Sequence, residues 1–197
     1  KSVWTNITYT GVLDNGANYD SSIDYAQIGL LDDGECLVDN VSVTSGGGPN
    51  LVANPGFESD QGLNNWSLQG DCARSSLENS GYNSSYSLHI RASDKVWPGD
   101  NSCQAVLNPN SLASGQTVTL SFEARWLHGW PEVLLRLNGN WLEATAAMPV
   151  PTNLGSPGEP NSQYVTNAGP AIYNVTHNPP LPAAYQSAVV TANVSDP

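Results

Sequence analysis

Residues 51–66, with the sequence LVANPGFESDQGLNNW, constrain the fold more than any other part of this chain. A short apolar run leads into an Asn-Pro-Gly turn at positions 54–56, where proline fixes φ and glycine permits φ above zero. Phe57 and Glu58 follow the turn, and neighbouring side chains of an extended chain point in opposite directions. The segment therefore predicts the beginning of a β domain, with Phe57 directed into its core.

Strand patterns run along most of the chain, whereas no segment sustains the apolar spacing of a helix. The clearest, residues 117–125 (TVTLSFEAR), alternates apolar and polar side chains as a half-buried strand does. Short strands separated by Gly, Pro, Asn and Ser are typical of a β-sandwich, so an all-β fold is predicted. Further strands are expected at residues 2–11, 25–31, 36–43, 86–91, 132–138, 141–148, 171–177 and 187–195.

The charge of the chain excludes some functions. Only 12% of the 197 residues are charged, and 18 acidic residues against 6 basic ones give a net charge of −12. This balance does not suit nucleic-acid binding, which depends on Lys and Arg contacts with phosphates. No apolar run reaches about 18 residues, so no membrane span is predicted. A soluble surface protein, or one that binds divalent cations, fits this composition.

The chain divides into five parts by composition and strand content. Residues 1–44 hold two or three strands, which is too little chain to bury a core alone. Residues 45–49 (SGGGP) are typical of a flexible linker. Residues 50–150 are predicted to form a complete sandwich, 151–170 an extended connector, and 171–197 two more strands.

Residues 51–66 resemble the opening of a galactose-binding-domain-like jelly roll, the fold of many carbohydrate-binding modules. Residues 25–43 resemble the final hairpin of another such jelly roll, with Asp39 ahead of an apolar strand. The resemblance implies that residues 1–44 are the C-terminal part of a preceding jelly-roll domain. Residues 171–197 resemble the first strands of an immunoglobulin-like or fibronectin-like domain.

The whole array resembles large secreted bacterial proteins that combine jelly rolls with lamin-tail-like and spore-coat-H-like modules. Residues 151–162 (PTNLGSPGEPNS) are similar to the connectors of such arrays. This resemblance implies an extracellular or cell-surface protein whose partners include neighbouring domains or subunits. Strand exchange between neighbours would then complete the half-domains at both ends.

Jelly rolls of this family commonly hold one structural calcium ion, and calcium prefers carboxylate and carbonyl oxygens. By resemblance, Glu58 matches the early acidic ligand position. Asp39 matches the late position, but in the preceding domain, and within residues 50–150 the last strand offers only Glu143. The alternative for Glu58 is an exposed strand carboxylate.

Tryptophans are the candidates for sugar contact, because the C–H faces of sugar rings pack on aromatic rings. Trp97 lies in a polar loop, a position that favours function, while Trp126 and Trp130 close a long strand and the loop after it. Packing at the end of the sandwich is the alternative for each of them. The expected polar companions are Asp94, Lys95, Asp100 and Arg136.

The cysteines match no zinc-binding spacing, since no CxxC occurs. Cys72 and Cys103 fall in the same predicted domain and are candidates for a disulfide, which would indicate an oxidising compartment. Cys36 would then be inert in the core or paired outside this chain. Three buried, reduced thiols are the alternative.

No catalytic motif is present. The three histidines lack a nucleophile and an acid at any recognisable spacing, and no GxSxG, HExxH or Walker sequence occurs. We therefore expect a non-catalytic, extracellular carbohydrate-binding module whose partner is a glycan or polysaccharide. The alternative is a structural or adhesive repeat that forms a spacer or a surface filament without binding sugar, because fold does not determine function.

Overall fold

The computed structural model describes residues 2–13, 23, 25–58, 61–94, 102–108, 112–138, 142–152, 171–178, 187 and 189–195. Two units are present, one formed by Ser2–Val150 and one within Pro151–Pro197.

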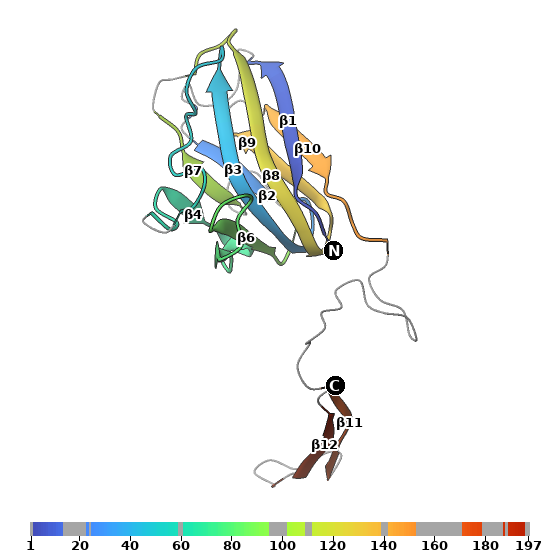
Figure 1. The fold of residues 1–197 in the computed structure, drawn as a ribbon. Helices are drawn as coiled ribbons and strands as arrows, with labels where there is room; N and C mark the ends of the chain where they lie inside the picture. The colour runs from blue at the N-terminus through green and yellow to red at the C-terminus, as the bar shows by residue number, and fades with distance from the viewer. Residues whose placement is uncertain are drawn as a thin grey trace. The chain divides into compact units, whose positions relative to one another are not determined.

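The first unit is a sandwich of two antiparallel sheets with five described strands each (Figure 1). Sheet A has the order β1 (Thr5–Val12), β8 (Thr117–Gly129), β3 (Gly34–Ser45), β6 (Ser87–Ala92) and β5 (Ser76–Glu78). Sheet B has the order β10 (Glu143–Ala147), β9 (Glu132–Leu137), β2 (Tyr25–Leu30), β7 (Cys103–Val106) and β4 (Trp66–Leu68). A short 3-10 helix, η1 (Gly70–Cys72), follows β4. The predicted all-β sandwich is confirmed.

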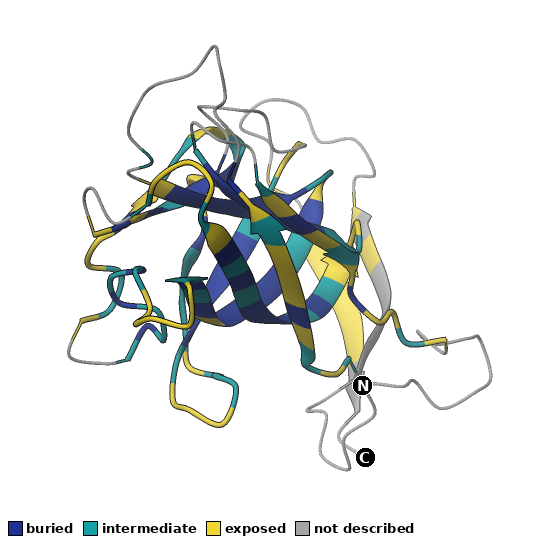
Figure 2. Cartoon of the chain, turned by 90° about the horizontal axis from the view of Figure 1, so that it is seen from above, coloured by how far each residue is buried: buried dark blue, intermediate teal, exposed yellow. Residues whose placement is uncertain are grey.

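Alternation along the strands builds the core between the sheets. On β8 the inward side chains are Val118, Leu120, Phe122 and Ala124, all fully buried, as the sequence pattern predicts. Sheet B contributes its own inward residues, such as Ile28 and Leu135, to the same apolar cluster. Viewed from above, buried residues are concentrated in the strands of the sandwich, where they are interspersed with exposed and intermediate residues, while most described loop residues are exposed or intermediate (Figure 2).

The N-terminal strands belong to this sandwich, which corrects the predicted division of the chain. β3 lies in the middle of sheet A between β8 and β6, and β2 lies in the middle of sheet B between β9 and β7. Residues 1–44 are therefore not the remainder of a preceding domain. They cannot bury a core alone, and in this structure they obtain their cross-strand hydrogen bonds and their core contacts from residues 50–150.

Residues 45–49 form a turn inside the sandwich rather than a linker between domains. Gly46 and Gly47 adopt φ of 58° and 75°, values that glycine reaches without strain. The amide of Gly46 donates to the carbonyl of Thr117 at 3.2 Å, and that of Gly48 donates to Ser45 at 2.9 Å. The turn therefore connects β3 directly to residues 51–66.

Residues 51–66 close on themselves around Phe57, which is fully buried. Trp66 packs on the Phe57 ring with centroids 4.9 Å apart and donates its Nε1 to the carbonyl of Asn54 at 2.9 Å. Positive φ falls on Asn54 (53°) and Phe57 (56°), not on the glycine of the predicted turn. The side-chain Nδ2 of Asn54 holds this conformation by donating to the carbonyls of Gly62 and Asn64 at 2.8 and 3.1 Å.

The second unit contains a two-stranded antiparallel pair, β11 (Ala171–Asn178) and β12 (Val189–Ser195). Both strands lie where the sequence predicts them. Val189 and Val190 of β12 are about two-thirds exposed, at 67% and 66%. Apart from residues 151 and 152, the predicted connector lies outside the described residues.

Removing residues 1–45 should prevent the sandwich from folding, because each sheet would lose an interior strand and expose the core beside it. We expect the fragment 46–150 to show no cooperative thermal transition by circular dichroism. The fragment 1–150 is the matched control, since it keeps strands β1 to β10, and it should melt cooperatively. A cooperative melt of 46–150 at the temperature of the control would contradict this assignment.

Candidate functional site

A row of polar side chains crosses the outer face of sheet B from one edge strand to the other. The strand register pairs Glu143 with Arg136, Arg136 with Gln27, Gln27 with Gln104, and Gln104 with Ser67. Directly opposed residues of paired strands lie on the same face, so these five side chains form one line. We call this line the polar band.

The alternation of each strand places the polar band outside the core. Ala26 and Ile28, on either side of Gln27, belong to the buried apolar cluster, as does Leu135 beside Arg136. Side chains next to each other on a strand point to opposite faces. Gln27 and Arg136 therefore point away from the core although they are deeply buried.

Arg136 contacts its neighbours on both sides at the β9 end of the polar band. Its Nε donates to Gln27 Oε1 at 3.0 Å, and its Nη1 lies 3.8 Å from Glu143 Oε1. The exposed fractions of Arg136 and Gln27 are 4% and 1%. Burial lowers the pKa of Arg136, and the Glu143 carboxylate opposes that shift. Gln27 Nε2 is buried and has no hydrogen-bond partner among the described residues, a rare and costly state for a polar atom.

The β7 and β4 end of the polar band is more open to solvent. Ser67 is exposed, whereas Gln104 and the neighbouring Gln69 have intermediate exposure. Gln69 Nε2 donates to Ser67 Oγ at 3.1 Å and to Gln104 Oε1 at 3.5 Å. Amide and hydroxyl groups offer both donors and acceptors, so this end is equipped to bind a ligand rich in hydroxyl groups.

Two exposed aromatic side chains border the same face. Tyr25 is 39% exposed and lies two residues before Gln27 on β2, so it shares that face. Trp130 is 43% exposed and donates its Nε1 to Glu132 Oε2 at 3.0 Å, at the start of β9. Sequence reasoning selected Trp130 and missed Tyr25, although the alternation in YAQIGL places Tyr25 beside Gln27.

The structure separates the other residues predicted to contact sugar. Trp126 is 6% exposed on the inner face of β8 and donates its Nε1 to the carbonyl of Gly129 at 3.0 Å. It is a packing residue rather than the predicted sugar contact, because β8 continues to Gly129 and its alternation carries Trp126 inward. Asp94 is exposed after β6 and lies outside the polar band. Trp97, Lys95 and Asp100 lie outside the described residues.

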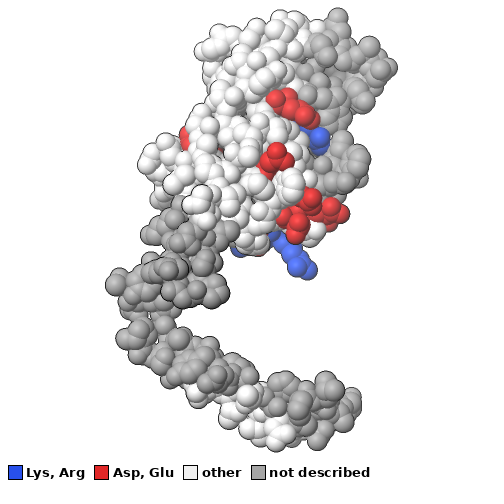
Figure 3. Space-filling model, turned by 90° about the vertical axis from the view of Figure 1, so that its right-hand side faces the viewer, with Lys and Arg blue, Asp and Glu red and all other residues white. Residues whose placement is uncertain are grey.

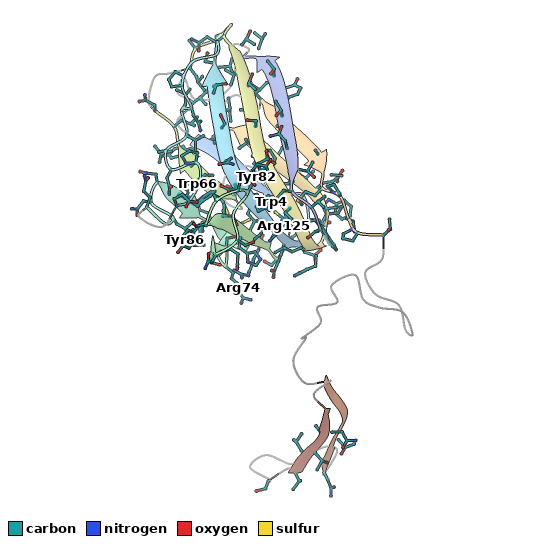
Figure 4. The ribbon with its side chains drawn as sticks, viewed as in Figure 1. Trp4, Trp66, Arg74, Tyr82, Tyr86 and Arg125 are labelled. Carbon is teal, nitrogen blue, oxygen red and sulfur yellow. The ribbon has the colours of Figure 1, made fainter. Side chains whose placement is uncertain are left out.

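An aromatic cluster covers part of the outer face of sheet A. Trp4 and Tyr82 meet edge to face with ring centroids 5.9 Å apart, and the Arg125 guanidinium carbon lies 5.1 Å from the centroid of the Trp4 ring. Arg125 Nη2 also donates to Ser80 Oγ at 3.0 Å. Figure 4 shows Trp4, Tyr82 and Arg125 gathered at the same end of the sandwich. These contacts occupy that part of sheet A.

A charged cluster joins the three inner strands of sheet A. Glu35 on β3 lies 2.6 Å from His89 Nε2, 3.3 Å from His128 Nε2 and 3.7 Å from Arg91 Nε. The other ring nitrogen of His89 lies 3.3 Å from Glu78. Burial raises the pKa of Glu35, but hydrogen bonds and charge interactions with the two histidines outweigh burial, and the net shift is downward. The cluster links β3 to β6 and β8.

A second pair of carboxylates lies where the 51–66 segment meets β3. Asp39 is fully buried at a bulge in β3, where Asn40 adopts φ of 51°. Asp39 Oδ2 accepts hydrogen bonds from the amide of Tyr82 at 2.8 Å and from Ser84 Oγ at 2.7 Å. The amide of Val41 on β3 donates to the carbonyl of Pro55 at 3.0 Å, which fixes the turn against the strand.

Glu58 is the second carboxylate of this acidic pair. Its Oε1 accepts a hydrogen bond from the amide of Tyr86 at 3.3 Å, in the loop that also binds Asp39. Burial raises the pKa of Asp39, the hydrogen bonds from Ser84, Tyr82 and Asn40 oppose this, and the charge of Glu58 adds to the increase. Asp39 and Glu58 therefore interact within one sandwich, which corrects their assignment to two domains.

The ligand atoms of the acidic pair fit a calcium ion in type. No ion pair reaches Asp39 from the described part of the chain, so a buried carboxylate lacks a neutralising cation. The two carboxylates supply oxygen atoms, which calcium prefers as ligands. Glu143 does not join them, because it pairs with Arg136 on sheet B. Within the described ranges no group of three or more His, Cys, Asp or Glu residues is able to hold a metal.

The surface of the molecule carries few charges. Figure 3 shows one face, on which acidic and basic side chains form small separate groups and most described atoms belong to uncharged residues. This agrees with the 12% of charged residues in the sequence. In the described part of the chain, no helix is long and apolar enough to cross a membrane.

Together these features define a β-sandwich with a band of polar side chains, two of them amides, across the outer face of one sheet. Residues 49–144, just under half of the chain, match the carbohydrate-binding domain family. No curated protein and no solved structure gives a significant match to the chain. The family match supports a carbohydrate-binding module. It begins after β3 and ends within β10, so strands β1, β2 and β3 lie outside it.

Replacing Glu35 by Gln should lower stability by about 1 kcal/mol at pH 6, because the hydrogen bonds and charge interactions with His89 and His128 would be weakened. The pKa of Glu35 is lower in the folded state than in the unfolded state. Its contribution to the free energy of unfolding is therefore fully present above its pKa in the unfolded state, and it is lost as the pH falls through its pKa in the folded state. Urea unfolding at pH 6 and pH 3 measures this, and the difference between the two proteins should shrink at pH 3. An equal difference at both values would contradict the assigned role.

Proposed function

We propose that Ser2–Val150 is a non-catalytic carbohydrate-binding module that binds a neutral glycan across the polar band. The observation that carries the proposal is the alignment of five polar side chains over all the described strands of sheet B. The match of residues 49–144 to the carbohydrate-binding domain family supports it. The outer face of sheet A is less suitable, because Trp4, Tyr82 and the charged cluster around Glu35 occupy it.

The dimensions and chemistry of the polar band suit a linear, uncharged glycan. Four spacings between neighbouring strands give a length of about 19 Å, enough for a short oligosaccharide. Amides and one hydroxyl dominate the band, and its single guanidinium is paired with Glu143. Tyr25 and Trp130 border the face and offer aromatic surface to the apolar side of a sugar ring.

Members of the polar band have different roles in this proposal. Arg136 and Gln27 are too deeply buried to meet a glycan in this conformation, so they act as positioning residues for their neighbours. Direct contact is assigned to Gln104, Ser67 and Glu143, which are at least partly exposed.

We also propose that the acidic pair of Asp39 and Glu58 holds a calcium ion. The support is the buried carboxylate of Asp39, which has no ion-pair partner among the described residues, and its interaction with Glu58. Asn40 contributes a further oxygen, since its Oδ1 lies close to Gly56 of the turn that precedes Glu58. A bound ion would neutralise both carboxylates and fasten the 51–66 segment to β3.

The proposal also covers where the module is located and which domains accompany it. An extracellular, multidomain protein is supported by the carbohydrate-binding family and by the separate β11–β12 unit. A two-stranded pair with exposed valines is at most marginally stable alone, so β11 and β12 fit the beginning of a larger domain. A spacer or adhesive role without sugar binding is the competing function.

Replacing Gln104 by Ala should weaken glycan binding roughly tenfold, about 1.4 kcal/mol, because a direct hydrogen bond from the polar band is lost. Affinity electrophoresis through gels that contain soluble cellulose derivatives, xylan or mixed-linkage β-glucan identifies a ligand, and titration calorimetry measures the affinity. The Arg136→Lys variant should also bind more weakly, since lysine cannot reproduce the contact geometry of the guanidinium.

Thr119→Ala, on the outer face of sheet A, is the control and should bind like the original protein. Retention by none of the polysaccharides would favour the structural role. Equal losses for Gln104→Ala and Thr119→Ala would show that binding does not use the polar band.

Calcium at about 1 mM should raise the melting temperature by roughly 5 °C relative to EDTA, because the ion binds only the folded acidic pair. Asp39→Asn and Glu58→Gln should abolish the increase, and Glu143→Gln should retain it. The calcium-induced increase in melting temperature should become smaller as the pH falls, because protons compete with the ion for Asp39. Since the pKa of Asp39 is raised, this loss should begin at a pH above the ordinary pKa of an aspartate. Differential scanning fluorimetry measures these shifts, and an unchanged increase in Asp39→Asn would contradict the assignment.

A further inference from the structure

Three thiols converge in the core of the sandwich from different elements. Cys36 lies on β3, Cys72 in η1 and Cys103 at the start of β7, and all three are free, buried and part of one apolar cluster. The thiols of Cys72 and Cys103 are hydrogen bonded to each other, and Ser75 also hydrogen bonds with Cys103. The two cysteines that the sequence selects as a disulfide candidate are therefore neighbours in space.

The backbone holds Cys72 and Cys103 in this arrangement. Cys103 pairs with Leu68 across β4 and β7, and the amide of Gln69 donates to the carbonyl of Ser102 at 3.0 Å. The amide of Cys72 donates back to the carbonyl of Gln69, also at 3.0 Å, which folds η1 over the start of β7. A disulfide requires two cysteines whose backbones lie close together, and these hydrogen bonds bring η1 and the start of β7 to one corner of the fold.

Cys36 is held differently. It lies on the interior strand of sheet A, opposite Ile90 of β6 and Trp126 of β8, so its position is fixed from both sides. η1 is a three-residue helix at the edge of the fold, and Gly70, Ala73 and Arg74 around Cys72 are exposed. Cys72 can therefore reach solvent by local opening of η1, whereas Cys36 requires that sheet A open.

We propose that Cys72 and Cys103 form a disulfide when the folded protein meets a small-molecule disulfide such as oxidised glutathione, and that Cys36 stays a thiol. The bond joins η1, which leads into β5 of sheet A, to β7 of sheet B. It therefore crosslinks the connection between the two sheets. β7 also carries Gln104, but the proposal is independent of glycan binding.

The exchange proceeds in two balanced steps. The Cys72 thiolate attacks one sulfur of glutathione disulfide, the S–S bond breaks, and the released glutathione takes up the proton from Cys72. Cys103 then loses its proton and attacks the Cys72 sulfur of the mixed disulfide, releasing the second glutathione. Two protein thiols are oxidised and one glutathione disulfide is reduced to two glutathiones.

The environments of the thiols support this order of attack. The hydrogen bond from Cys103 lowers the pKa of Cys72, although burial opposes it. The same hydrogen bond and burial raise the pKa of Cys103, and burial raises the pKa of Cys36. The thiolate is the reactive form, so Cys72 is the first nucleophile.

Peptide mapping tests the pairing in the complete chain. The protein is incubated with oxidised or reduced glutathione, denatured, alkylated with iodoacetamide and cleaved after glutamate. Cleavage at Glu35, Glu58, Glu78 and Glu123 places the three cysteines in three peptides, residues 36–58, 59–78 and 79–123. After oxidation we expect peptides 59–78 and 79–123 to be joined, with Cys36 alkylated. After reduction all three cysteines should be alkylated.

Two outcomes would overturn the proposal: Cys36 found in the disulfide, or all three cysteines still alkylated after oxidation. Oxidation should also raise the melting temperature of the original protein by roughly 10 °C, because the bond closes the loop between residues 72 and 103. The Cys36→Ala variant should form the same disulfide and show the same increase. Cys103→Ala should form no disulfide between these positions. If this core variant does not fold, the peptide map of the original protein still tests the pairing.

Discussion

The pairing of β3 with β6 and β8 is the interaction on which the rest of this structure depends. β3 lies in the middle of sheet A, and its inward residues Val38 and Val43 are fully buried. Its outward Glu35 joins both neighbouring strands through His89 and His128. Its bulge directs Asp39 towards the loop that also binds Glu58. One strand thus contributes to the core, the charged cluster and the acidic pair.

The two outer faces of the sandwich are used differently. Aromatic and charged contacts occupy much of sheet A and stabilise the pairing of its strands. Sheet B presents the polar band in a line across its strands, and the exposed rings of Tyr25 and Trp130 border the same face. The central member of that line, Gln27, comes from β2, outside the residues that match the carbohydrate-binding domain family. A fragment cut at residue 49 would therefore lack the central residue of the polar band.

Local patterns in the sequence predict the strands but not all of their partners. Alternation identifies β8 and β9 because their apolar residues recur every second position, and continuing the β8 alternation by two residues would have placed Trp126 inside. The placement of β2 and β3 depends on pairing over long sequence distances, which local periodicity does not carry. The polar band cannot be predicted from local patterns for the same reason, because Gln27 is aligned with Gln104 and Arg136 only by the register of the paired strands.

Side-chain NMR of the glutamines tests the central claim most directly. Gln27, Gln69 and Gln104 each carry an amide NH₂ group in or beside the polar band, and Gln61 and Gln116 provide reference signals on loops elsewhere in the chain. Titration of the ¹⁵N-labelled protein with an oligosaccharide of the polysaccharide that retains it should shift the signals of Gln104 and Gln69 most, followed by Gln27. Shifts confined to Gln61, Gln116 or the Trp4 indole, with the signals of Gln104 and Gln69 unmoved, would contradict a glycan site on sheet B.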